Sequence, residues 1–250
     1  MVRFGLMSSS KSQTPDRAPR LRGRSLLLYK MALAPLLKLQ GLYTRKNVIR
    51  LPEPEGVRSG IAGSHEQQRT LGILVVGDSS AAGVGVLTQD DALAPQIASA
   101  ISSQTGQMVR WQLVAKIGTT VFNASRLLAS QKLESADVLV LCLGGNDVIR
   151  QSRPGEFLRA YRNLVKDLSE KVGAKIVVIN GLPPMHILPA TPQPLRWYLG
   201  QCAYRLDAAL HLLAASAPHF KYVSLQWAAV AEDLASDRFH PGKGQYKEWA

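Results

Sequence analysis

The sequence predicts an α/β fold built on a parallel β-sheet, and two observations carry this prediction. Beyond residue 70, short apolar runs alternate with longer segments of helical periodicity. Three of the runs are continuous stretches of Val, Ile and Leu, which is typical of strands buried on both faces of a parallel sheet. This alternation favours helices on both faces of one sheet, a three-layer α/β/α sandwich with a parallel sheet of about five strands.

Each element follows from its local pattern. The expected strands are 71–77, 110–115, 137–143, 175–180 and 220–225. Apolar residues at a 3.6-residue spacing predict helices near 90–104, 121–133, 155–172 and 194–216. A last short helix is expected over 241–249, with Pro241 in its first turn. Because no internal repeat interrupts this order, residues 71–250 are interpreted as one domain.

The positive charge of the chain is concentrated at its N-terminal end. The 250 residues carry a net charge of +12. Residues 1–50 hold eleven Lys and Arg against a single acidic residue, Asp16, whereas the remainder is nearly neutral. Residues 1–24, rich in Ser, Pro and Arg, are interpreted as a disordered basic leader. Aromatic side chains do not interleave with this charge, so no specific nucleic-acid partner is expected.

Residues 25–70 form a second N-terminal segment. Residues 25–42 are strongly apolar but contain Lys30, Pro35 and Lys38, which fits a membrane-spanning helix poorly because such a helix needs about 20 predominantly apolar residues. Two interpretations stay open: peripheral contact with an anionic membrane, or a helix that covers the globular domain. Residues 51–70 are interpreted as a linker wrapping the domain.

The composition of these N-terminal segments also bears on location. The expected location is the cytoplasm or the inner face of a membrane. The long polar leader fits a secretory signal poorly, but an Arg-rich, acid-poor leader is also typical of an organelle transit peptide, so a cleaved signal stays open.

Chemically active residue types follow four of the five expected strands. Because ligands of parallel sheets bind at the carboxyl ends of the strands, these positions are the candidates for a site. In chain order the clusters are Gly77-Asp78-Ser79, Gly118, Gly144-Gly145-Asn146-Asp147 and Asp237-Arg238-Phe239-His240.

The residue types in these clusters suit acyl transfer. A serine hydroxyl is a weak nucleophile unless a base takes its proton. The i, i+3 spacing of Asp237 and His240 lets the carboxylate orient the imidazole as that base. Ser79 is expected near a helix N-terminus, and the Gly118 backbone and the Asn146 side chain offer N–H donors for a developing oxyanion.

These four ordered blocks resemble the SGNH (GDSL-type) hydrolase superfamily, whose pattern is GDS, a later Gly, GxND and DxxH. The resemblance spans residues 77–240 and implies a flavodoxin-like α/β/α fold that hydrolyses acyl esters. It implies that Ser79 is the nucleophile, His240 the general base and Asp237 its orienting acid. It also implies an oxyanion hole made of the Ser79 and Gly118 backbone N–H groups and the Asn146 side chain. Ser80 departs from the GDSL signature, which has Leu there.

The loop that follows the fourth strand is the candidate substrate pocket. Residues 181–200 contain five prolines, and Met185, Ile187, Leu188 and Trp197 are expected to line a site for the acyl or alcohol group. The substrate is expected to be a small acyl ester. Acyl transfer to an alcohol, hydrolysis of carbohydrate O-acetyl groups and a non-enzymatic membrane- or nucleic-acid-binding role for the basic arm are the alternatives. No metal-ligand pattern is present, so no metal or cofactor is expected, and the oligomeric state is not predicted.

Overall fold

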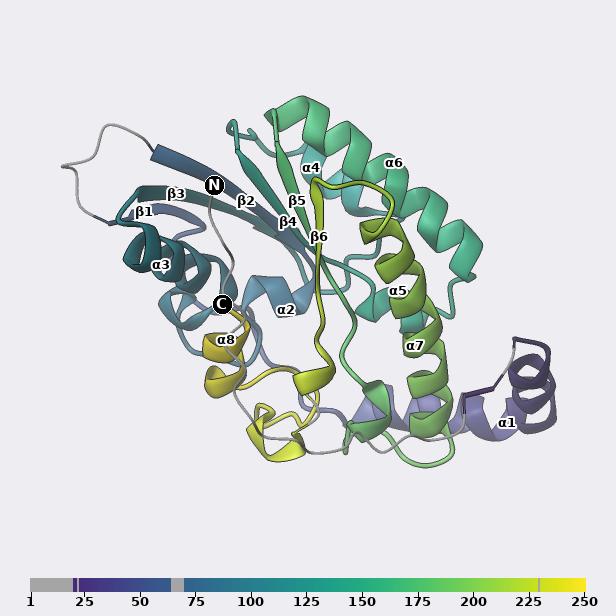
Figure 1. Ribbon diagram of the computed structural model, residues 1–250. Coiled ribbons are helices and arrows are strands. Elements are labelled where there is room, and N and C mark those ends of the chain that lie inside the picture. The colour runs from purple at the N-terminus through teal and green to yellow at the C-terminus, as the bar shows by residue number, and fades with distance from the viewer. Residues whose placement is uncertain (1–19, 22, 64–69, 229) are drawn as a thin grey trace.

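The computed structural model describes residues 20, 21, 23–63, 70–228 and 230–250. These residues form an α/β/α sandwich around one twisted sheet (Figure 1). The sheet has six strands in the order β1-β3-β2-β4-β5-β6. Only β1 at the edge is antiparallel to its neighbour, and every other pair is parallel. The predicted α/β/α class is therefore confirmed.

The elements have the following bounds. The strands are β1 Ser59–Ala62, β2 Thr70–Gly77, β3 Met108–Ala115, β4 Val138–Cys142, β5 Ile176–Asn180 and β6 Phe220–Val223. The α-helices are α1 Gly23–Asn47, α2 Ser79–Ala82, α3 Leu93–Thr105, α4 Ala124–Ala129, α5 Gly145–Ile149, α6 Pro154–Val172, α7 Leu195–Ala214 and α8 Lys243–Trp249. Short 3₁₀ turns are η1 Gln89–Asp91, η2 Met185–Ile187, η3 Gln226–Ala228 and η4 Ala231–Asp233.

The two faces of the sheet belong to two hydrophobic cores. In β2, Ile73 and Val75 face the core that also contains α3 residues, whereas Leu74 and Val76 face the core beneath α4, α6 and α7. Successive strand side chains point to opposite faces, so a strand covered on both sides needs an unbroken apolar run. This is why the central strands show no polar alternation.

The strand order brings the predicted clusters to one place. The chain moves from β2 to β3 on one side and then to β4 on the other, so the direction of winding reverses around β2. In such sheets the crevice at the carboxyl ends of the strands beside this reversal is the usual ligand site. The segments after β2, β3 and β4 all leave the sheet there (Figure 1).

Several expectations are corrected. The segment 51–70 is not only a linker, because Ser59–Ala62 pairs with β3 and closes the sheet edge. Pro241 precedes the last helix, which begins at Lys243. Helix α4 covers only Ala124–Ala129 of the expected 121–133.

The N-terminal segments are described only in part. The predicted leader 1–24 lies mostly outside the described residues. The apolar segment 25–42 belongs to one helix, α1, that packs on α7. No helix in the described ranges has the length and apolarity needed to cross a bilayer.

Candidate active site

Ser79 is positioned by a tight exit from β2. A Cβ atom at Gly77 would lie 2.4 Å from the Ala81 Cβ and 2.6 Å from the Cys142 carbonyl oxygen, so only glycine fits this bend. Asp78 then caps α2, and its Oδ1 accepts from the Ser80 backbone N–H at 3.0 Å. Ser79 is the first residue of α2, where a backbone N–H has no partner within the helix.

Asp237 and His240 lie in a short closed loop near the C-terminus. Leu234 and Pro241 pair across the base of the loop. The Asp237 Oδ1 accepts from the backbone N–H groups of Phe239 at 2.9 Å and His240 at 3.0 Å. These bonds fix the carboxylate inside the turn, so its second oxygen is directed at the imidazole.

The three side chains form one hydrogen-bonded chain. Asp237 Oδ2 lies 2.5 Å from His240 Nδ1, and His240 Nε2 lies 2.9 Å from Ser79 Oγ. The Asp237 side chain is fully buried, and 18% of the His240 side chain is exposed. The structure therefore brings together three side chains that are up to 161 positions apart in the sequence.

The local environment keeps Asp237 ionised. Burial by itself raises the pKa of this carboxyl. The hydrogen bonds and charge from His240, together with the Phe239 N–H, outweigh burial and hold the pKa of Asp237 below its usual value. An ionised Asp237 accepts a hydrogen bond from the Nδ1–H of His240, which keeps the ring proton on Nδ1 and leaves Nε2 free to accept from the serine hydroxyl.

The predicted oxyanion donors lie on the two neighbouring turns. Gly118 has a φ of +80°, a left-handed conformation that suits glycine, in the turn after β3. Asn146, in α5 after β4, lines the same pocket as Ser79. Its Nδ2 donates to Asp78 Oδ2 at 3.2 Å and to the Thr119 carbonyl at 3.1 Å. The Asn146 amide is therefore held in place from both sides.

Asp147 connects these two turns. Its Oδ2 accepts from the Val121 backbone N–H at 3.1 Å, so α5 is tied to the loop that carries Gly118. Burial raises the pKa of Asp147 to about 6; the negative charge of Asp78 adds to this rise, and the Val121 N–H opposes it. Asp147 therefore holds the turn after β4 against the turn after β3.

A mostly apolar cavity of about 110 Å³ opens beside Ser79 and His240. Of the predicted pocket residues, Met185, Ile187 and Leu188 line it. Trp197 was expected there, but it packs against Tyr29 of α1 with ring centroids 4.7 Å apart. This correction has a simple cause: α7 begins at Leu195, and Trp197 lies on the face of its first turn that meets α1.

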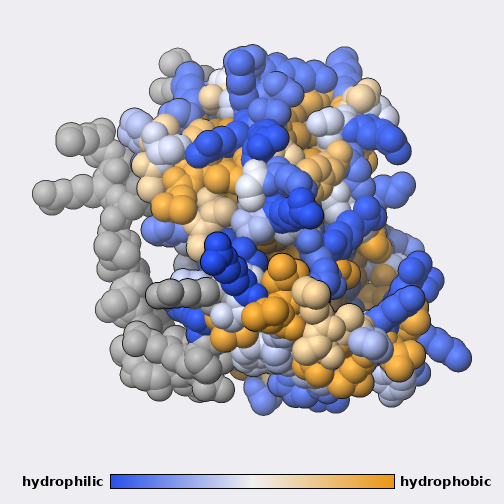
Figure 2. Space-filling view, turned by 90° about the vertical axis from the view of Figure 1, so that its right-hand side faces the viewer, coloured by the Kyte–Doolittle hydropathy of each residue, from blue (hydrophilic) through white to orange (hydrophobic). Residues whose placement is uncertain are grey.

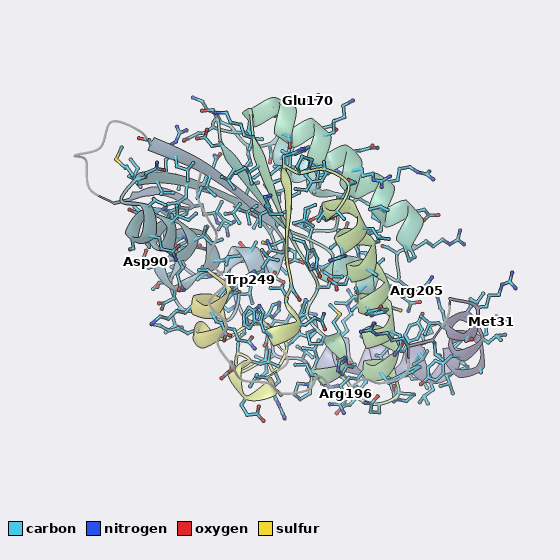
Figure 3. The ribbon with its side chains drawn as sticks, in the orientation of Figure 1. Met31, Asp90, Glu170, Arg196, Arg205 and Trp249 are labelled. Atoms are coloured by element: carbon cyan, nitrogen blue, oxygen red, sulfur yellow. The ribbon has the colours of Figure 1, made fainter. Side chains whose placement is uncertain are left out.

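Sequence reasoning missed other residues of the cavity wall. Trp249 of α8 lines the cavity, and its indole N–H donates to Asn180 Oδ1 at 2.8 Å. Figure 3 shows Trp249 beside the carboxyl ends of the strands. Trp227 contributes from η3. Asn180 could have been found, because it is a polar residue that directly ends the apolar run of β5.

The α/β/α fold thus places Ser79, His240 and Asp237 in one hydrogen-bonded chain at the carboxyl ends of the strands. A family model described as the GDSL-like lipase/acylhydrolase family matches residues 75–247. The chain belongs to this family.

Individual relatives agree with this assignment. A GDSL-like esterase of Mycobacterium tuberculosis is 26% identical over 182 residues, which cover 70% of this chain and 57% of that protein. The chain thus spans little more than half the length of this relative.

Solved structures share the fold. The crystal structure of the lipase Lip_vut3 from a goat rumen metagenome has a TM-score of 0.59 at 18% identity. The matched region covers 72% of this chain and 93% of the lipase chain. A member of the lipolytic G-D-S-L family from Veillonella parvula has a TM-score of 0.53 at 14% identity. The matched region covers 72% of this chain and 94% of that protein's chain.

Proposed function

We propose that this protein hydrolyses small carboxylic esters, with Ser79 as nucleophile, His240 as general base and acid, and Asp237 as the residue that orients the imidazole. The observation that carries the proposal is the continuous chain of contacts from Asp237 Oδ2 through the ring to Ser79 Oγ, at 2.5 and 2.9 Å. Membership of the GDSL-like lipase/acylhydrolase family supports the same class of reaction.

The first half-reaction acylates Ser79. His240 Nε2 takes the hydroxyl proton while Ser79 Oγ bonds to the ester carbonyl carbon, and the carbonyl oxygen becomes an oxyanion. When the tetrahedral intermediate collapses, the bond to the alcohol oxygen breaks and His240 returns the proton to that oxygen. The alcohol leaves, and the acyl group remains on Ser79.

The second half-reaction repeats these steps with water. His240 takes a proton from the water as its oxygen attacks the acyl carbon, and then returns the proton to Ser79 Oγ as the acid leaves. Asp237 stays ionised throughout, in keeping with its lowered pKa. Its charge stabilises the imidazolium that forms in each step.

The oxyanion is assigned to three donors, which are the backbone N–H groups of Ser79 and Gly118 and the side-chain amide of Asn146. Ser79 is the first residue of α2, so its backbone N–H has no acceptor within the helix. The dipole of this four-residue helix adds a small stabilisation of negative charge at the same point. Asn146 differs, because both of its N–H groups already have acceptors in Asp78 and Thr119. Donation to an oxyanion therefore requires Asn146 to share or exchange one of these two bonds.

The lining of the cavity favours a substrate with an apolar acyl or alcohol group. Its wall includes Ile149, Leu188, Trp227 and Trp249, with few polar side chains apart from the reacting groups. A carbohydrate O-acetyl ester would present several hydroxyls that need polar partners. The lining therefore favours an alkyl ester over a sugar ester.

The test is turnover of nitrophenyl esters of increasing chain length by the wild type and by Ser79→Ala. We expect wild-type activity on one or more of these esters and loss of turnover in the variant. Ser80→Ala is the matched control, because its hydroxyl bonds to Asp78 rather than to His240. Equal activity in wild type and Ser79→Ala would end the serine-hydrolase proposal.

A further inference from the structure

Helix α1 is attached to the body by one of its faces. Leu26 and Leu37 are buried in the core that α6 and α7 also enter. The Gln40 side chain donates to the Gln193 carbonyl at 2.6 Å and accepts from the Leu195 N–H at 3.0 Å. Together with the packing of Tyr29 on Trp197, these contacts fix the orientation of the helix.

The opposite face of α1 is apolar and exposed. Leu28, Met31, Leu39 and Leu42 have exposed fractions of 67, 65, 64 and 56%. At 3.6 residues per turn these four side chains fall within an arc of about 80°. Figure 3 shows Met31 on the part of α1 farthest from the sheet, and Figure 2 shows apolar atoms along the lower part of the face that includes α1. We call these four residues the outer stripe.

Positive charge lies at both ends and along one edge of the outer stripe. Arg24 lies one turn before Leu28 and Lys46 one turn after Leu42, both on the line of the stripe, and both are exposed. Lys38 and Arg45, also exposed, lie along one edge of the stripe. Residues 20–50 contain no Asp or Glu, so this surface carries no charge of opposite sign within its own segment.

The apolar outer stripe and the positive charge beside it favour an anionic membrane over a second copy of this chain as the partner of this face. A second copy that docked through the same face would bring two basic, acid-free helices together, and like charges repel. An anionic bilayer offers both an apolar layer for the outer stripe and phosphates for the basic side chains. The charges also explain why α1 suits the surface of a bilayer and not its interior.

We propose that the outer stripe of α1 docks on the surface of an anionic membrane, with the helix lying in the plane of the interface. Gln40 contacts Gln193 in the loop before α7 and Leu195 at the start of α7. This loop follows closely on Met185 and Leu188 of the cavity wall. Docking therefore holds the cavity end of the sheet near the lipid surface. Figure 1 shows α1 at the same end of the molecule as the carboxyl ends of the strands.

The experiment measures binding of the full chain to vesicles of phosphatidylcholine, with and without phosphatidylglycerol, by co-sedimentation. We expect binding that requires phosphatidylglycerol and weakens as salt rises. Lys38→Gln, Arg45→Gln and Lys46→Gln together should lower affinity on the order of 100-fold, from about fivefold for each cation. Leu28→Gln, Met31→Gln and Leu39→Gln together should lower affinity more than about tenfold.

Matched controls separate the stripe from general surface effects. Leu87→Gln and Leu212→Gln alter leucines that are 88 and 67% exposed elsewhere on the body, and should bind as the wild type does. All variants should melt at the wild-type temperature. This readout does not depend on ester turnover, so failure of the proposed function leaves it intact.

Three outcomes would overturn the proposal. Wild-type affinity in the stripe variant would mean that charge alone, including that of the N-terminal leader, drives binding. No binding of the wild type to anionic vesicles would exclude docking outright. A concentration-dependent dimer seen by light scattering and lost in the stripe variant, without vesicle binding, would assign the surface to a second copy.

Discussion

Replacing Asp237 by Asn tests how the proton on His240 is placed. Asp237 Oδ1 accepts two backbone N–H groups, at 2.9 and 3.0 Å, and Oδ2 faces His240 Nδ1 at 2.5 Å. An asparagine amide has the same shape, but only its oxygen can accept those two N–H groups. Its NH₂ group must then face Nδ1.

The expected result follows from this arrangement. An NH₂ group donates to Nδ1, so the ring proton moves to Nε2, and Nε2 can no longer accept from Ser79. Turning the amide over would restore the tautomer but would leave two backbone donors without an acceptor, at a cost of about 1–3 kcal/mol each. We expect kcat to fall about 10³–10⁴-fold, as for the same change in other Ser-His-Asp enzymes, which is about 4–5.5 kcal/mol in the activation barrier.

The assay is steady-state hydrolysis of the best nitrophenyl ester, with circular dichroism and thermal melting to show that the fold is intact. Asp233→Asn is the matched control, because Asp233 is an exposed acid four residues earlier, and it should keep the wild-type rate. A folded Asp237→Asn protein within tenfold of the wild-type kcat would refute the tautomer argument.

Three further predictions concern the surroundings of the site. Asn146→Ala should lower kcat about 10²–10³-fold with little change in KM, because one oxyanion donor is lost; steady-state kinetics measures this. Asp147→Asn should flatten the pH dependence of stability. The folded protein holds the Asp147 proton up to about pH 6, so the wild type should lose up to about 3 kcal/mol of unfolding free energy between pH 4 and 7 that the variant keeps, as urea unfolding would show. Trp249→Ala should enlarge the cavity and shift kcat/KM toward longer acyl chains in an ester series.

Each of these predictions has a contrary outcome. An unchanged kcat in Asn146→Ala would leave the oxyanion to backbone donors alone. Parallel stability curves for wild type and Asp147→Asn would mean that Asp147 titrates normally in the folded protein. An unchanged chain-length profile in Trp249→Ala would mean that the acyl group lies elsewhere, and Trp249→Phe, which keeps most of the wall, is the companion variant.

The apolar patterns of short segments predicted the central strands correctly. The run LGILVVG is short, apolar on both faces and ends in glycine, which predicts a buried strand, and β2 is found at Thr70–Gly77. Because parallel strands place their carboxyl ends at one edge, the proximity of Ser79 and Asn146 follows from strand order. The loop of Asp237 and His240 was predictable only as a neighbour of that edge.

Other features depend on contacts that sequence periodicity does not contain. The four residues Ser59–Ala62 become a strand because β3 offers a free edge, with Gly60 opposite Trp111. Trp197 suited a pocket by its chemistry, but the position of α1 decides which side of α7 it covers. Trp249 reaches the cavity because α8 packs against α3 and brings the indole to Asn180 at the end of β5.

Covalent labelling with a fluorophosphonate, followed by peptide mapping of the modified residue, tests directly whether Ser79 is the nucleophile. We expect one labelled serine, Ser79, with labelling abolished in Ser79→Ala and strongly slowed in Asp237→Asn. Absence of labelling in an active, folded protein, or modification of a different serine, would contradict it.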